Sequence, residues 1–320
     1  MFSDGGKMKI IKFITFAIIA FYTGSALAQN VTSQISDEQA LDSTPVYAQK
    51  EVSVQKQNIY NSISDEEIKS ILLNGSSKQL KELLDKKIDV NIDYGCSTLL
   101  NKAIQSLIAN QNPAATPEDT LEKVKMLIDA GADVNLATCG LTPLATLTGI
   151  PDFAQKMEKI YIETIMSNID YSSDMCHVNG VPKICKDTTP SEREQMKAEI
   201  HKIFQEEIRK IEPYYTKIAE ILVQHGADIN KKSNGIAPLH FAADVPNNEK
   251  PILLKYLLEK GADVNIRDFQ GNTPLFVANF ADNKEVINLL IKFGADVTIR
   301  NDKGILYKDF KTGELYNYSY

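Results

Sequence analysis

The sequence is poor in the residues that carry most enzyme chemistry. Tryptophan is absent, and the 320 residues include four cysteines and four thinly spread histidines. No G-x-S-x-G, H-E-x-x-H, P-loop or paired G-x-G motif is present. We therefore predict no catalytic residues, no metal site and no cofactor, and expect that the protein is not an enzyme.

The sequence also lacks an excess of basic residues. Its formal net charge is −7, and it contains no long block of charges of one sign. Nucleic acids require a basic face to neutralise their phosphates, so this balance argues against a nucleic-acid partner. The hydrophobic share of 43% is enough for a full core and indicates a globular protein.

No apolar run is long enough to span a membrane. The run Phe13–Tyr22 has ten residues, whereas a spanning helix needs about 20. Basic residues precede it at Lys7, Lys9 and Lys12, and Ser25-Ala26-Leu27-Ala28 follows. This order is typical of a secretory signal peptide. We predict a signal peptide over residues 1–28 and an exported mature protein, periplasmic or secreted and without a membrane anchor; an uncleaved anchor is the alternative.

One phrase recurs along most of the remaining chain. Gly261-Ala262-Asp263-Val264-Asn265 returns 33 residues later as 294–298, and it appears upstream at 226–230 and 131–135, with a fainter copy at 89–91. A Thr-Pro-Leu-like phrase follows each copy except the last, at residues 98–100, 142–144, 237–240 and 273–275. Repetition at a fixed period near 33 is typical of a repeat protein.

These phrases resemble the ankyrin repeat, over roughly residues 64–310. The resemblance implies an all-α solenoid of stacked units, each a turn followed by two antiparallel helices. We count five repeats and the start of a sixth at residue 299: 64–91, 92–135, 136–230, 231–265 and 266–298. Residues 29–63, polar and rich in Gln and Ser, are predicted to be a flexible leader, and 311–320 a C-terminal tail.

Single residues fit this unit. Thr273 can cap a first helix and Pro274 stands at its first position. Gly294 ends the second helix, where a left-handed residue is wanted. The resemblance implies that His240 is a structural histidine, hydrogen-bonded near the helix start.

The third repeat contains an insertion, because it has 95 residues where the period predicts about 33. Apolar residues recur at helical spacing on both arms of the insertion: Phe153, Met157, Ile160, Ile165 and Ile169, then Met196, Ile200, Ile203, Phe204, Ile208, Ile211, Ile218 and Leu222. Residues 189–192 form a capping box, and Pro213 predicts a kink or a new helix start. We predict a long antiparallel helical hairpin over about residues 150–212, with its tip around 170–189.

The four cysteines form two candidate pairs. Cys176 and Cys185 flank an Asn-Gly turn at 179–180, and a disulfide between them would stabilise the tip by about 2–3 kcal/mol. Cys96 and Cys139 lie in neighbouring turns, where a disulfide would join two repeats. Free thiols are the alternative for both pairs. A zinc site at Cys176, His177 and Cys185 is a weaker alternative, because these residues lack the usual ligand spacing and a fourth ligand. A catalytic thiol at Cys176 is another, but a disulfide would abolish its reactivity.

The resemblance implies a protein-binding module. In this family the contacts come from the turn fingers and the inner helices. The matching positions here are Tyr94, Thr138, Ser233, Asn234, Arg267, Phe269, Gln270, Asn272, Phe280 and Arg300. Phe269, between Arg267 and Arg300, is the best candidate for a binding hot spot; a single scattered aromatic is the alternative. We expect a monomer with an unidentified protein partner, and a secreted bacterial effector that binds host proteins is a second interpretation.

Overall fold

The computed structural model describes residues 64–93, 97–109, 116–138, 140–151, 154, 158, 162, 175–178, 181–184, 189–245 and 251–310. The chain divides into two compact units. The first comprises residues 1–88, 108–115 and 156–210, and the second comprises 89–107, 116–155 and 211–320.

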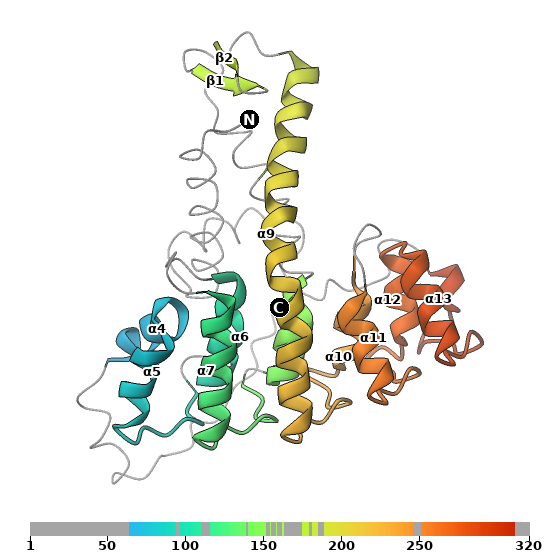
Figure 1. Ribbon diagram of the computed structural model, residues 1–320. Coiled ribbons are helices and arrows are strands. Elements are labelled where there is room, and N and C mark those ends of the chain that lie inside the picture. Colours follow the sequence, from blue (N-terminus) through green and yellow to red (C-terminus); the bar gives the residue numbers. More distant parts are fainter. Residues whose placement is uncertain are drawn as a thin grey trace, which may run out of the picture. The chain divides into compact units, whose positions relative to one another are not determined.

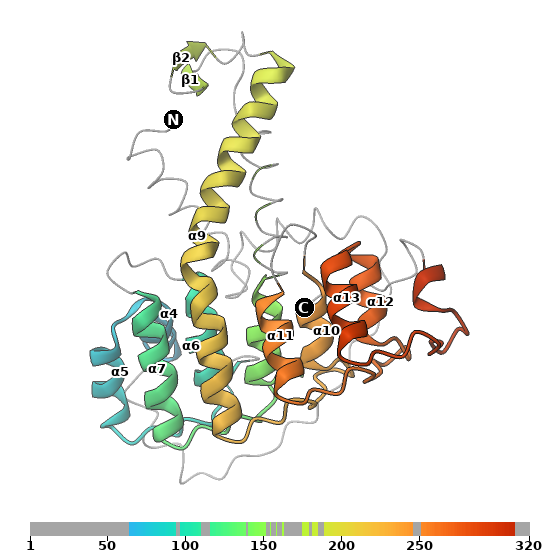
Figure 2. The same cartoon turned by 45° about the vertical axis from the view of Figure 1, so that its right-hand side comes forward.

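The second unit consists of helix pairs stacked side by side (Figures 1 and 2). The pair α10 (Pro238–Ala243) and α11 (Ile252–Glu259) packs beside the pair α12 (Pro274–Phe280) and α13 (Lys284–Lys292). Upstream helices are α6 (Leu99–Ala109), α7 (Pro117–Asp129) and a helical stretch over 143–151. The short 3-10 helix η2 (Tyr307–Asp309) follows α13. The all-α ankyrin solenoid predicted from the sequence is confirmed for this stack.

A narrow apolar core runs between the helices of each pair. Leu239, Leu254 and Leu257 are almost fully buried in the pair α10–α11, as are Leu275, Val286 and Leu290 in the pair α12–α13. The last helix pair is closed at one side by Phe310, which follows η2 and meets Phe276 edge-to-face with 5.4 Å between ring centroids. The partial sixth repeat thus acts as an end cap for α12.

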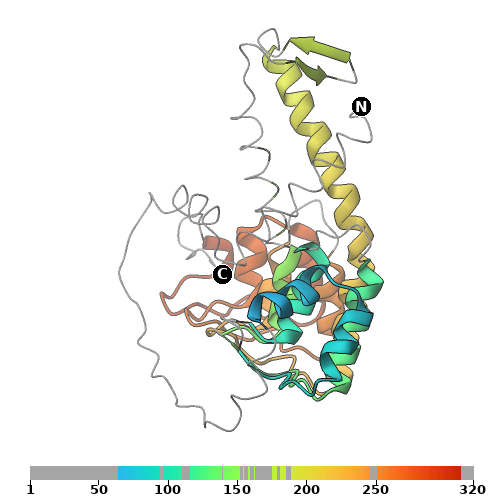
Figure 3. The ribbon, with the colours of Figure 1, turned by 90° about the vertical axis from the view of Figure 1, so that its left-hand side faces the viewer.

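An asparagine at the end of every copy of the recurring phrase except the last joins its repeat to the next. The side-chain amide of Asn91 donates to the carbonyl of Gly131 at 3.0 Å, while its Oδ1 accepts the N–H of Asp133 at 2.7 Å. Asn265 repeats both bonds with Gly294 and Asp296, at 3.3 and 2.8 Å. Asn135 also makes both bonds, and Asn230 makes the one to the N–H of the next aspartate. We call Asn91, Asn135, Asn230 and Asn265 the asparagine ladder. Figure 3 shows the loops that carry it running alongside one another.

The insertion leaves the ladder unbroken. Asn135 binds Gly226 and Asp228 at 2.8 and 2.7 Å, although 91 and 93 positions separate them in sequence. The next step, from Asn230 to the N–H of Asp263 at 2.9 Å, spans an ordinary 33 positions. The extra residues therefore leave the stack and return to it without changing the step between repeats.

The first unit contains most of the insertion together with α4 (Asp65–Asn74) and α5 (Ser77–Leu84). The long helix α9 (Pro190–Gln224, 35 residues) begins in this unit and ends in the other. All eight apolar residues predicted for its stripe are buried. Glu158, on the first arm, accepts a hydrogen bond from His201 Nδ1 at 2.5 Å and from Gln205 Nε2 at 3.3 Å. These contacts join the two arms of the insertion within this unit.

Three details differ from the sequence-based expectations. The helix α9 continues through Pro213, so of the kink or restart predicted there the restart is wrong. Ile211 and Tyr215 on either side are buried, and their packing opposes the break that a proline favours. Thr273 is the N-cap of α12, yet its side chain makes no capping bond. The insertion also carries a two-stranded antiparallel hairpin, β1 (Met175–Val178) and β2 (Val181–Ile184), beyond the all-α description (Figure 1).

The disulfide predictions are not tested by this structure. Cys96, Cys139 and Cys185 lie outside the described residues, and for Cys176 only the backbone is described. In the hairpin, Cys176 stands opposite Lys183. Both pairings remain predictions.

The asparagine ladder predicts a loss of stability when one step is removed. Asn135→Ala should lower the free energy of unfolding by about 1–2 kcal/mol, because two hydrogen bonds between repeats are lost. Urea denaturation followed by circular dichroism measures the loss. Asn288→Ala, an exposed asparagine on α13, serves as the matched control, and an equal loss in both variants would contradict the role of the ladder.

Candidate protein-binding surface

The loops that begin at Thr138, Ser233, Asp268 and Arg300 each form a short finger. Isolated backbone bridges join Thr138 to Leu141, Ser233 to Ile236 and Arg300 to Leu306. In the finger before α12, Asp268 N donates to the carbonyl of Asn272 at 2.8 Å. The fingers are therefore held by their own backbone before any side chain is considered.

The predicted contact residues divide by burial. Asn234, Arg267, Phe269, Phe280 and Arg300 are exposed and Gln270 is half-buried, whereas Tyr94 lies outside the described residues. The side chains of Thr138, Ser233 and Asn272 are at most 6% exposed. These three residues cannot contribute to a contact surface in this structure: Ser233 Oγ, for example, accepts the N–H of Thr142 at 3.1 Å in the neighbouring finger.

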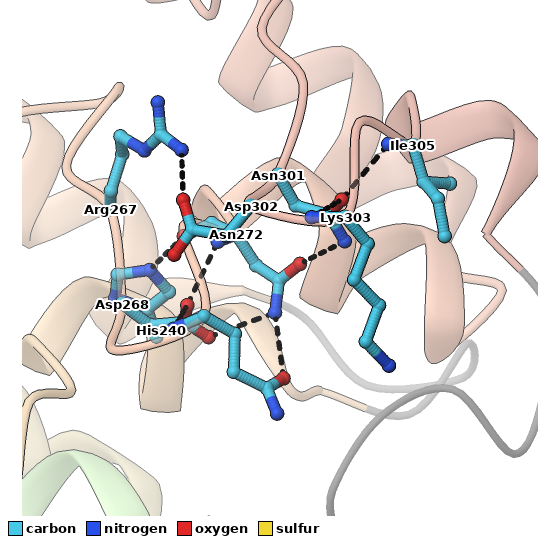
Figure 4. A network of polar contacts seen from close by, with 9 residues as sticks. His240, Arg267, Asp268, Asn272, Asn301, Asp302, Lys303 and Ile305 are labelled. Atoms are coloured by element: carbon cyan, nitrogen blue, oxygen red, sulfur yellow. Dashed lines mark hydrogen bonds and ion pairs between the residues drawn. The ribbon is translucent and has the colours of Figure 1, made fainter.

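Asn272 lies in a polar network that joins three repeats (Figure 4). His240 Nε2 donates to the Asn272 carbonyl at 3.0 Å, and His240 Nδ1 accepts the N–H of Ala237 at 3.3 Å. The carboxylate of Asp268 accepts the backbone and side-chain N–H of Asn272 at 2.8 and 3.1 Å. Asn301 then donates to Asn272 Oδ1 at 3.0 Å. The structural role predicted for His240 is confirmed.

An asparagine replaces the histidine in the second repeat, which sequence reasoning missed. Asn101 occupies the place of His240, and its Nδ2 donates to the carbonyl of Leu141 at 3.1 Å. Leu141 precedes Thr142 just as Asn272 precedes Thr273. The signal was available, because Asn101 stands three residues after Thr98 in the degraded Thr-Leu-Leu phrase.

Fingertip glycines receive a side chain from the following finger. A Cβ built on Gly235 would lie 2.8 Å from the Cβ of Phe269, and one on Gly140 would overlap the side chain of Asn234. A Cβ on Gly271 would overlap Asp302 of the following finger and Arg267 of its own finger. Since all three glycines also have positive φ, they allow the turn and the close approach together.

These approaches place four exposed side chains in sequence along successive fingers. Asn234 lies against Gly140, Phe269 against Gly235, and the Arg267–Asp302 ion pair (2.7 Å) against Gly271. We call Asn234, Phe269, Arg267 and Asp302 the fingertip strip. Phe269 is its apolar member, with 55% of its surface exposed.

Buried charged groups lie elsewhere and were not foreseen. Lys123 on α7 is fully buried, and this burial lowers the pKa of its ammonium to about 8, opposed by the charge of Asp119. Burial also shifts the pKa of the Glu158 carboxyl, in this case upward, and the hydrogen bond from His201 opposes that shift. Among the described residues, no three His, Cys, Asp or Glu side chains cluster as metal ligands would. The same residues include no helix with the length and apolarity to cross a bilayer.

Two glycines with positive φ, Gly131 after α7 and the fingertip Gly235, predict different costs of adding a methyl group. Gly131→Ala introduces strain only through its φ of +91°, since nothing lies near its Cβ; the cost should be about 1–2 kcal/mol. Gly235→Ala adds contact with Phe269 to the same strain and should cost more. Urea midpoints of the two variants measure the difference, and equal losses would show that the fingers do not pack as described.

His240 predicts an acid-dependent loss of stability. Burial lowers its pKa in the folded protein, with the Asn272 carbonyl opposing the shift. The unfolded chain therefore takes up the proton first, and the free energy of unfolding should fall as the pH drops below about 6.5. In His240→Asn, which copies the arrangement at Asn101, the bond can form without titration. This variant should therefore lose less stability between about pH 7.5 and about pH 5. Identical pH profiles in urea denaturation would contradict this account.

Comparison with known proteins agrees with the geometry. Residues 211–301 match the family model of ankyrin repeats in three copies. An ankyrin repeat-containing protein of Schizosaccharomyces pombe is 40% identical over 74 residues, covering 23% of this chain and 33% of the relative. Putative ankyrin repeat proteins of Rickettsia felis and Rickettsia bellii are 35% identical over 101 residues and 42% identical over 66 residues.

These relatives are matched only in part. The Rickettsia felis match covers 28% of this chain and 44% of the relative, and the Rickettsia bellii match covers 19% and 39%. The chain thus spans less than half the length of each of these relatives. Residues 211–301 are ankyrin repeats, and such repeats imply a protein–protein interaction module.

Proposed function

We propose that this protein is an exported, non-catalytic binding protein that captures another protein through its fingertip strip. The observation that carries the proposal is Phe269. It remains 55% exposed even though its Cβ is held against Gly235 by close packing. An exposed aromatic whose Cβ is packed against a neighbouring finger and whose finger also carries Arg267 and Gln270 suits a binding hot spot.

The surroundings of Phe269 support this reading. Arg267 is fixed by its ion pair with Asp302, and Asp268 beneath the tip is fixed by its bonds to Gln270 and Asn272. The asparagine ladder holds the fingers in one register. A surface arranged in advance in this way requires little rearrangement on binding.

The place where binding occurs is part of the proposal. The sequence pattern over residues 1–28 and the even number of cysteines favour export. A bacterial effector that binds host proteins is the second candidate, and it would share the same sequence features while differing in where export ends. An enzyme with a thiol nucleophile at Cys176 is the least favoured, since a disulfide in an oxidising compartment would block the thiol.

Phe269→Ala should weaken partner binding by about 2 kcal/mol without lowering the melting temperature, as expected for a hot spot outside the core. The partner is first identified by affinity capture with residues 29–320 and mass spectrometry, and its affinity is then measured by calorimetry. Ile291→Ala, which shortens an exposed apolar side chain on α13, should leave the affinity unchanged. Equal effects of both variants, or unfolding of Phe269→Ala, would contradict the assignment.

Export predicts a defined mature chain. Cell fractionation followed by intact-mass and N-terminal analysis should find the protein outside the cytoplasm and beginning at Gln29. Thiol titration in denaturant should detect fewer than four thiols until reductant is added. A full-length cytoplasmic protein with four free thiols would contradict the export part of the proposal and leave the binding part standing.

A further inference from the structure

We infer that the partner offers an acidic segment carrying an apolar side chain, and that this segment binds at the fingertip strip and the lysines around it. The inference rests on the proposed function and names the chemistry of its partner. It follows from the charges on the tips of the last three fingers, residues 231–235, 267–271 and 300–304.

The tips of these fingers are basic, although the whole chain has a net charge of −7. Five exposed cationic side chains occupy them: Lys231, Lys232, Arg267, Arg300 and Lys303. The two carboxylates in the same segments are already engaged. Asp268 is 7% exposed and accepts three N–H groups within its own finger, and Asp302 is paired with Arg267. Arg267 and Asp302 offset each other, so the cations that the tips offer to a partner are Lys231, Lys232, Arg300 and Lys303.

Several of these cations are held in place. Lys231 Nζ donates to the carbonyl of Asn135 at 3.0 Å, and Arg300 Nη1 donates to the carbonyl of Gly304 at 2.7 Å. Figure 4 shows Lys303 extending from the same finger that carries Asn301 and Asp302. Cationic groups that are fixed before binding lose less entropy when a carboxylate arrives.

Phe269 supplies the apolar centre of this basic surface. Phe269 follows the buried Asp268 in sequence, and its side chain lies against Gly235. The finger that contains Gly235 also carries the exposed Lys232. An apolar centre with a charged rim favours a partner segment of the reverse kind, with one apolar side chain between carboxylates.

The base of each finger favours a short protein segment over a polyanion. Asp228, Asp263 and Asp296 are exposed there, and each accepts the N–H of the residue two positions on, at 2.8–2.9 Å. A nucleic acid presents phosphates at a close, regular spacing and would meet these carboxylates as it crossed the fingers. An acidic peptide confined to the tips would avoid them.

The absence of tryptophan from the chain permits a direct test with the full mature protein. The probe is the synthetic peptide acetyl-Asp-Glu-Trp-Glu-Asp-amide, whose tryptophan emission reports its own environment. Titration with the protein should shift this emission to shorter wavelength, and raising the salt from about 0.05 M to about 0.5 M should weaken the binding. A peptide with lysines in place of the four acidic residues should bind at least about tenfold more weakly.

Two pairs of charge reversals locate the site. Lys232→Glu with Lys303→Glu should weaken binding of the acidic peptide by about tenfold or more. Lys255→Glu with Lys292→Glu, at the surface groove between α11 and α13, makes the same change of charge away from the fingers and should have little effect. Circular dichroism checks that both variants remain folded.

The inference is overturned if the acidic peptide does not bind, if both double variants weaken it equally, or if the lysine peptide binds as tightly. Tighter binding of a 20-nucleotide oligouridine at about 0.15 M salt would overturn it in favour of nucleic acid. If the peptide fails while a protein is still captured in a Phe269-dependent manner, the proposed function stands and only this inference falls.

Discussion

The hydrogen bonds made by the ladder asparagines set the geometry on which the rest of this protein depends. Asn91, Asn135 and Asn265 each bind both a carbonyl and an N–H of the next repeat, so they fix the distance and the orientation of that repeat together. Asn230 binds the N–H of Asp263. The glycines and aspartates that these asparagines bind belong to the same recurring phrase. The phrase therefore encodes contacts between repeats as well as the end of a helix.

The ladder also explains how the stack tolerates an insertion. A connection that leaves and returns between the two helices of one repeat does not alter the loops that carry the asparagines. The step at Asn135 is accordingly as short as the steps on either side of it. At the other end Thr298 takes the place of an asparagine, and its hydroxyl binds Asp296 within the same loop. The ladder ends there, and Phe310 covers α12 instead.

The fold could be read from the sequence wherever the period was clear. The phrase at 261–265 and its copies located the loops, and the apolar stripe of α9 located its buried face. Contacts that the repeat pattern does not encode could not be predicted from the sequence. Phe310 covers α12 through a contact with Phe276 that no repeat pattern encodes. Lys123 is buried although its residue type favours the surface. Pro213 favours a helix break, but packing of its neighbours overrides that preference.

The candidate surface was predicted less well than the fold. The positions came from a family pattern, which does not show whether a side chain points outward or into its own finger. Asn272 and Ser233 matched the pattern and proved to be buried, because their polar groups hold adjacent fingers together. Phe269 matched it and is exposed. The packing of Asn234 against Gly140 and of Phe269 against Gly235 was not predicted, because these contacts join residues from different repeats.

The asparagine ladder and the polar network around His240 and Asn272 have complementary roles. The ladder sets the spacing of the fingers, and the network around His240 and Asn272 fixes the shape of the last ones. The spacing and the shape are thus both set by buried or paired groups, and the exposed side chains of the fingertip strip lie outside these contacts.

Amide hydrogen exchange at the ladder tests the central claim most directly. The account predicts that the Asp228 amide, which binds Asn135 across the insertion, exchanges as slowly as the Asp263 amide, which binds Asn230 across an ordinary repeat. Protection of Asp263 with free exchange at Asp228 would show that the insertion interrupts the stack, and would contradict the account.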